Sequence, residues 1–99
     1  MDAYSMKSVA PSVAAILELE RPAAATEAPI EDLVRDLRTV PHVAVLAPDA
    51  LGIVPWRLWC DEMPFLKSLH ARRSVLLESI MPSSTPMNFA CMLTGAELA

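Results

Sequence analysis

The sequence predicts a mixed α/β fold in which helices cover a mostly parallel sheet in a layered α/β/α arrangement. Three observations predict it. Amphipathic helical patterns occur in both halves of the chain. One short run, at 42–47, is apolar on both faces, as in the buried strands of parallel sheets, and a second, at 74–80, has strand-like content. Between residues 42 and 95 these patterns alternate as strand, helix, strand, helix, which is typical of right-handed parallel crossovers. With 99 residues, the chain forms one domain at most.

The first 40 residues are predicted to form a helical segment. Val13, Ile16 and Leu17 are spaced by three and four, and Pro11 suits the first turn of a helix. A linker, "RPAAATEAP", follows at residues 21–29. A second amphipathic helix has the same spacing at Ile30, Leu33, Val34 and Leu37, with acidic residues at its amino end and arginines at its carboxyl end.

Residues 41–99 are predicted to form the amino-terminal part of an α/β domain. The run "HVAVLA", at 42–47, predicts a buried strand that stops at Pro48 and Asp49. A helix is expected over "MPFLKSLHARR", at 63–73, and a second strand within "SVLLESI", at 74–80. A last helix is expected to begin at Pro86 and to end at Gly95, which suits the carboxyl-terminal cap.

The chain is more hydrophobic than most soluble domains of its size. Hydrophobic residues make up 54% of the sequence and the mean hydropathy is +0.36. Prolines and charges interrupt the most apolar region, so a transmembrane helix is not expected. Lys7, "VAPSVAAIL" and the alanines at 23–25 suggest a signal peptide, but Asp2 and Pro11 favour a short soluble helix and a cytoplasmic protein. Apolar surface is then expected to be covered by a partner, by self-association or by further protein.

Charge and cysteine content exclude several classes of function. The net charge is −4 and the isoelectric point is near 5.0, so no nucleic-acid-binding surface is expected. Cys60 and Cys91 lie 31 residues apart with no C-x-x-C spacing, and therefore predict two buried free thiols rather than a zinc or redox motif.

The hydroxyl-rich stretch "MPSSTPMNF", at 81–89, is the first candidate site. Ser83, Ser84 and Thr85 can each cap the following helix. Free amides and the dipole at a helix start also favour a phosphate or a developing negative charge, and Asn88 adds a side-chain donor one turn on. If the two strands are neighbours, Asp49 and Thr85 are expected to face one crevice at the carboxyl ends of the strands.

The stretch "PSSTPMNFACMLTG" resembles the nucleophile motif of the alkaline phosphatase superfamily, and most closely that of its nucleotide pyrophosphatase and phosphodiesterase branch. The spacing agrees throughout, at Pro82, Thr85, Asn88, Thr94 and Gly95. "VAVLAPDALG" resembles the strand that ends in a metal-binding aspartate in this family, so the resemblance covers residues 43–95. In addition, "SVAPSVAAILEL" resembles a helix that many members carry near their carboxyl end.

This resemblance implies an alkaline-phosphatase-like fold, incomplete in this chain, and metal-dependent hydrolysis of phosphate mono- or diesters. Thr85 would be the nucleophile that forms a phosphoenzyme, and Asn88 would hold a phosphoryl oxygen. Asp49 and Thr85 would bind metal, the cofactors being two divalent ions, usually zinc. The substrate would be a phosphate ester or a nucleotide-like small molecule.

The resemblance also implies that these residues are one piece of a larger enzyme. The remaining metal ligands of the family, several aspartates and histidines, come far downstream of the nucleophile, whereas no Asp or His follows Thr85 here. Catalytic zinc generally needs three protein ligands. The 99 residues are therefore interpreted as an amino-terminal fragment that is inactive when isolated.

Other functions are open from the residues. A non-catalytic interaction module or degenerate fragment would pair through apolar surface, with Trp56, Trp59 and Phe65 as anchors. A serine hydrolase can be assembled from Ser83 or Ser84 with His70 and Asp49, but the chain has no G-x-S-x-G motif. A sulfatase motif is absent, because Met92 rather than proline follows Cys91.

Overall fold

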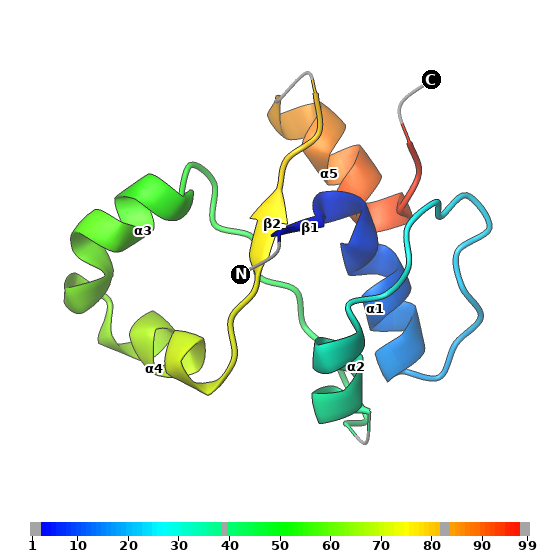
Figure 1. Ribbon diagram of the computed structural model, residues 1–99, viewed down its shortest axis with the longest axis horizontal. Coiled ribbons are helices and arrows are strands. Elements are labelled where there is room, and N and C mark those ends of the chain that lie inside the picture. The colour runs from blue at the N-terminus through cyan, green and yellow to red at the C-terminus, as the bar shows by residue number, and fades with distance from the viewer. Residues whose placement is uncertain (1–2, 39, 82–83, 98–99) are drawn as a thin grey trace. The chain divides into compact units, whose positions relative to one another are not determined.

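The computed structural model describes residues 3–38, 40–81 and 84–97. Over these residues the chain has five α-helices and a small two-stranded parallel sheet, a mixed α/β structure that is mostly helical (Figure 1). It divides into two compact units, residues 1–44 with 76–99, and residues 45–75. The division into 1–40 and 41–99 expected from the sequence stays a prediction.

The first unit contains the sheet and three of the helices. Strand β1 (Ala3–Ser5) pairs in parallel with β2 (Leu76–Glu78), with Tyr4 opposite Leu77. A 3-10 turn, η1 (Met6–Ser8), leads from β1 into α1. The helices of this unit are α1 (Val9–Ile16), α2 (Glu31–Leu37) and α5 (Thr85–Thr94). Helix α1 contacts both α2 and α5, and η1 also contacts α5.

The core of the first unit lies around α1, which packs against α2 and α5. Its buried apolar side chains come from α1, from the start of α2 and from the carboxyl half of α5: Ala14, Ile16, Ile30, Val34, Cys91 and Met92. Ser12 of α1 is also buried, and its hydroxyl donates to Ser8 O at 2.6 Å and accepts from Ile30 N at 2.8 Å. The predicted helices at 11–17 and 30–37 are therefore confirmed as α1 and α2.

Gly95 ends α5 as predicted. Its φ of 73° is left-handed, which a residue without Cβ adopts most easily. Its N–H donates to Cys91 O at 2.7 Å and its carbonyl accepts from Thr26 N at 3.1 Å. The linker that contains Thr26 is thereby joined to the end of the last helix.

The second unit is built from α3 (Ile53–Trp59), the 3-10 turn η2 (Cys60–Glu62) and α4 (Pro64–Arg72). Helix α4 confirms the helix predicted at 63–73, whereas α3 was not predicted. The rings of Trp56 and His70 lie 5.2 Å apart. The described residues of α3, η2 and α4 include none that is buried, and large apolar side chains are exposed here, among them Leu58, Trp59 and Phe65.

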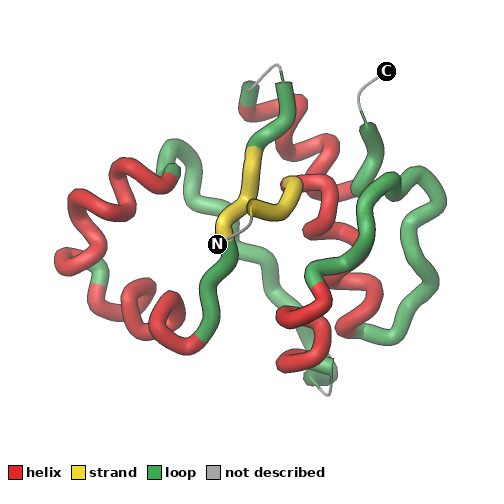
Figure 2. The backbone as a smooth tube through the Cα atoms, in the orientation of Figure 1, coloured by secondary structure: helices red, strands yellow, loops and turns green. Residues whose placement is uncertain are grey.

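The prediction of a strand at 42–47 is wrong. Figure 2 draws these residues as a loop, and Leu46 is 79% exposed. β-Branched residues favour an extended backbone, but a strand also needs a partner for its N–H and C=O groups. The second predicted strand is confirmed as β2, and its partner is β1, at the opposite end of the sequence. None of the helices within the described ranges has the length and apolar character to cross a membrane.

Candidate functional site

The start of α5 holds two of the three candidate residues. Thr85 is the first helical residue, one position before the predicted start at Pro86, and Ser84 is the N-cap with φ −118° and ψ 151°. The carbonyl of Ser84 accepts the N–H of Asn88 at 3.0 Å, which closes the first turn. The Ser84 hydroxyl makes no capping hydrogen bond, so the side-chain cap predicted at this residue is not formed. Ser83 and Pro82 lie outside the described residues.

Thr85 is exposed, and no hydrogen bond joins its hydroxyl to any residue in the described part of the chain. Pro86 has no N–H, so the main-chain donors of this first turn that lack a helical acceptor are those of Thr85 and Met87. A helix start of this kind attracts negative charge. The chemistry available here is a hydroxyl beside main-chain donors.

Asn88 lies one turn after Thr85 and is half-buried. Its Oδ1 accepts the N–H of Ile80 at 3.0 Å, and its Nδ2 donates to the carbonyl of Ser84 at 3.0 Å. Sequence reasoning assigned this residue a ligand role and did not foresee that its amide joins the exit of β2 to the start of α5.

Asp49 lies in the second compact unit, in a turn after the loop at 42–47. It therefore does not follow a strand, as the sequence had predicted. Its carboxylate is exposed and Oδ1 accepts the N–H of Ala50 at 3.0 Å. Ala50 has a φ of 59°, a left-handed conformation that is uncommon outside glycine. The structure thus groups Thr85 and Asn88 on one helix, and Asp49 belongs to the other unit.

The described residues do not fit the two-metal centre that the resemblance implies. No three His, Cys, Asp or Glu side chains in the described part of the chain lie close enough together to hold a metal ion. Because a zinc site generally uses three or four protein ligands, Asp49 and Thr85 would need others. We therefore assign no chemical step to a metal on the residues described.

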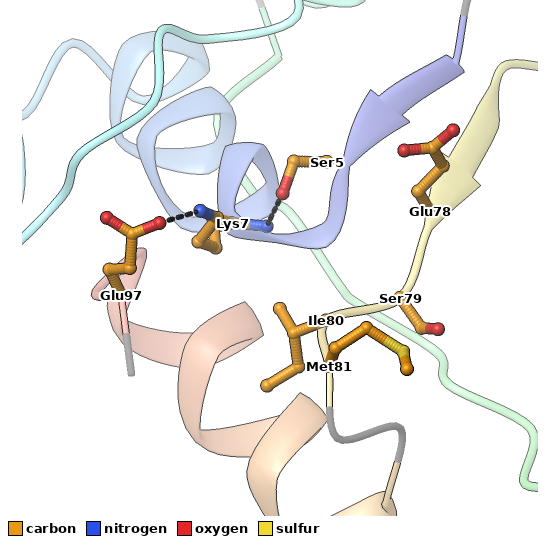
Figure 3. Close-up of a pocket in the computed structure, with 7 residues that line it drawn as sticks. All are labelled: Ser5, Lys7, Glu78, Ser79, Ile80, Met81 and Glu97. Atoms are coloured by element: carbon orange, nitrogen blue, oxygen red, sulfur yellow. Dashed lines mark hydrogen bonds and ion pairs between the residues drawn. The ribbon is translucent and has the colours of Figure 1, made fainter. Parts of the chain in front are cut away.

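A cavity of about 340 Å³ lies at the carboxyl ends of β1 and β2, where parallel sheets commonly bind ligands (Figure 3). It is lined by Ser5, Lys7, Glu78, Ser79, Ile80, Met81 and Glu97. Lys7 Nζ lies 2.8 Å from Glu97 Oε1 and 3.5 Å from Glu27 Oε1, and the Lys7 side chain is only 14% exposed. Sequence reasoning missed this cluster, because no local pattern connects residues 7, 27 and 97.

The ion pairs of Lys7 with Glu97 and Glu27 shift the pKa values of Lys7 and Glu97. The hydrogen bond from Lys7 holds the pKa of Glu97 below its usual value, and the hydrogen bond to Glu97 raises the pKa of Lys7. In the second unit, a hydrogen bond between Lys67 and Asp61 likewise lowers the pKa of the aspartate and raises that of the lysine. The two cysteines are free, as predicted. Cys91 is also buried, as expected, whereas the predicted burial of Cys60 is wrong, since this residue is half-buried.

Comparison of the chain with protein-family models, with curated proteins and with solved structures finds no match.

Proposed function

We propose that this chain is the part of a phosphoric ester hydrolase that carries the nucleophile, and that Thr85 attacks the phosphorus of phosphate mono- or diesters. The motif around Thr85 points to the nucleotide pyrophosphatase and phosphodiesterase type. One observation carries the proposal: Thr85 is exposed and is the first residue of a ten-residue helix that follows a parallel strand. That position presents a hydroxyl beside main-chain donors suited to a phosphoryl oxygen.

The arrangement of the first unit supports the proposal. Two segments resemble the superfamily, one around the nucleophile and one near the carboxyl end of its members. Here these segments lie together, since β1 pairs with β2 and α1 contacts α5. We propose that the unit is part of a layered α/β/α fold of the alkaline-phosphatase kind, completed by further protein that supplies the remaining strands.

The proposed reaction has two steps. The Oγ of Thr85 forms a bond to phosphorus while the bond from phosphorus to the ester oxygen breaks, and the departing alcohol takes up a proton. Water then attacks the phosphothreonine, which releases phosphate or a phosphomonoester and restores the hydroxyl. A threonine hydroxyl needs activation to react. By resemblance, two divalent ions, usually zinc, would supply that activation in the complete enzyme, on ligands from the further protein.

Replacement of the nucleophile tests the proposal directly. We expect Thr85→Ala in the complete protein to lower the turnover of bis(p-nitrophenyl) phosphate by about three orders of magnitude or more, and Thr85→Ser to retain part of it. The matched control is Thr26→Ala, which replaces an exposed threonine in the linker and should hydrolyse the substrate at the wild-type rate. Mass spectrometry of acid-quenched enzyme should find a p-nitrophenyl phosphoryl group on Thr85. Normal turnover by a folded Thr85→Ala protein would exclude Thr85 as the nucleophile.

A second candidate function is a non-catalytic interaction module, which the apolar surface of residues 45–75 favours. Trp59 is 56% exposed and Phe65 is 70% exposed, although aromatic side chains of this size are usually covered. If this alternative holds, replacement of Thr85 should leave the binding of the partner unchanged. Self-association, measured by analytical ultracentrifugation, would instead decrease in Trp59→Ser and Phe65→Ser.

A further inference from the structure

The side chain of Asn88 bridges the two described ends of the connection between β2 and α5. Its Oδ1 accepts the N–H of Ile80, two residues after the end of β2, and its Nδ2 donates to the carbonyl of Ser84, the N-cap of α5. The main-chain N–H of Asn88 also donates to the Ser84 carbonyl at 3.0 Å. Asn88 therefore holds the end of the strand segment and the start of the helix at the same time.

The orientation of the Asn88 amide is fixed by its partners, because one is a main-chain donor and the other a main-chain acceptor. The N–H of Ile80 can only donate and the carbonyl of Ser84 can only accept, so a flipped amide would lose both hydrogen bonds. An aspartate at this position keeps the acceptor for Ile80 and loses the donor to Ser84. An alanine keeps neither.

The two residues that Asn88 bridges lie next to Thr85 and the cavity. Ser84 directly precedes Thr85, and Ile80 lines the cavity at the carboxyl ends of the strands. A change in the Ser84 carbonyl would alter the first turn of α5 and with it the direction of the Thr85 side chain. A change at Ile80 would move one wall of the cavity.

We propose that Asn88 is a positioning residue, which sets the orientation of Thr85 through Ser84 and fixes the cavity wall at Ile80, rather than a ligand of the phosphoryl group. The part that concerns Thr85 rests on the function proposed above, whereas the bridge itself does not. Its amide oxygen and one amide N–H are already committed to the main chain. Binding of a phosphoryl oxygen by that N–H would remove one of the two donors of the Ser84 carbonyl and leave only the main-chain N–H of Asn88 to hold the turn before Thr85.

Hydrogen exchange in the 99-residue chain tests the bridge without any assay of activity. In Asn88→Ala we expect the Ile80 amide to exchange about tenfold faster, because it has lost its acceptor. Asn88→Asp should keep most of the protection. Thr94→Ala is the matched control: Thr94 also makes one donor and one acceptor bond to main chain on α5, but at its other end, so Ile80 should be unaffected. Equal exchange of Ile80 in the wild type and Asn88→Ala would overturn the bridge.

Comparing the activities of Asn88→Ala and Asn88→Asp distinguishes a positioning role of Asn88 from direct binding of the phosphoryl group. If Asn88 positions Thr85, Asn88→Ala lowers kcat about tenfold or more with little change in KM, and Asn88→Asp, which keeps the bond to Ile80, is the more active variant. If Asn88 binds the phosphoryl group, the aspartate repels it, so Asn88→Asp is the less active variant and raises KM. The second order would overturn the positioning role.

A titration with inorganic phosphate provides a readout that needs no turnover. The side-chain NH₂ signals of Asn88 should not move as phosphate is added, whereas a direct ligand would show a saturable shift. If Thr85→Ala leaves turnover unchanged, the proposed function fails, and the exchange data on Ile80 still decide whether the bridge exists.

Discussion

At the scale of single residues, Ser12 shows how one hydroxyl can join two segments. Only 1% of its surface is exposed. Its hydroxyl donates to Ser8 one turn earlier and accepts from the N–H of Ile30, at the N-cap of α2. Ile30 is itself 2% exposed, so its N–H has no access to water as an alternative acceptor. The hydroxyl of Ser12 therefore satisfies a buried main-chain group across the linker.

We expect Ser12→Ala to lower the free energy of unfolding by about 1–3 kcal/mol, the cost of leaving a buried donor without an acceptor. The measurement is urea denaturation followed by circular dichroism. Thr94→Ala is a suitable comparison because its hydroxyl has the same pattern of one donated and one accepted bond, but is exposed. Its effect should stay within about 0.5 kcal/mol. Equal losses in the two variants would show that the bond to Ile30 is unimportant.

At the scale of elements, the end of α5 depends on close packing against the linker and α1. A Cβ at Gly95 would lie 2.9 Å from Ala25 Cβ and 3.2 Å from Pro11 Cδ. The left-handed φ of 73° adds a second reason for glycine, since other residues are strained there. The carboxyl end of α5 is thus held against two segments more than 60 residues away in the sequence.

For Gly95→Ala we expect a loss of at least about 2 kcal/mol in the free energy of unfolding, from backbone strain and from the contact with Ala25. Thermal and urea denaturation measure it. The comparison is Gly52→Ala, where φ is −82° and no atom lies within 4 Å of the added Cβ, so the loss should not exceed about 1 kcal/mol. A Gly95→Ala protein as stable as the wild type would contradict the packing described for the end of α5.

At the scale of the whole molecule, the ion pairs of Lys7 join parts of the first unit that are distant in sequence. Lys7 follows β1, Glu27 lies in the linker and Glu97 follows α5. The pKa of Glu97 lies below its usual value of 4.5, so its contribution to stability is present above pH 4.5 and is lost as the pH falls through the lowered pKa. The pKa of Lys7 is raised above 10.5, so its contribution is present below that pH and is lost as the pH rises further.

We therefore expect the cluster of Lys7, Glu27 and Glu97 to stabilise the first unit across the neutral range, and acid to remove this effect. We expect Glu97→Gln to be less stable than the wild type at pH 7, and the difference to shrink as the pH falls below 4.5. Added salt should also reduce it, because Glu97 is exposed. Glu20→Gln, an exposed carboxylate in the loop after α1, should show no such dependence. A constant difference between wild type and Glu97→Gln from pH 3 to 7 would exclude the ion pair as its origin.

The elements that could be predicted from the sequence are those whose signals are local. Spacings of three and four predict α1, α2 and α4, the strand-like content of "SVLLESI" predicts β2, and Gly95 predicts the end of α5. The exposed position of Thr85 at the start of a helix follows from the same kind of signal, because prolines and hydroxyls favour helix starts. Helix propensity, capping and turn chemistry act over a few residues, so short stretches of sequence are enough to predict these features.

What only the tertiary structure decided is which distant segments meet. The run at 42–47 has the composition of a strand, yet β2 pairs with Ala3–Ser5. The contacts of Lys7 with Glu97, of Ser12 with Ile30 and of Asn88 with Ile80 leave no periodic signal, because each depends on how segments pack. Pairing between distant segments is chosen by the burial and hydrogen bonding of the whole unit, and a local pattern carries no information about the partner.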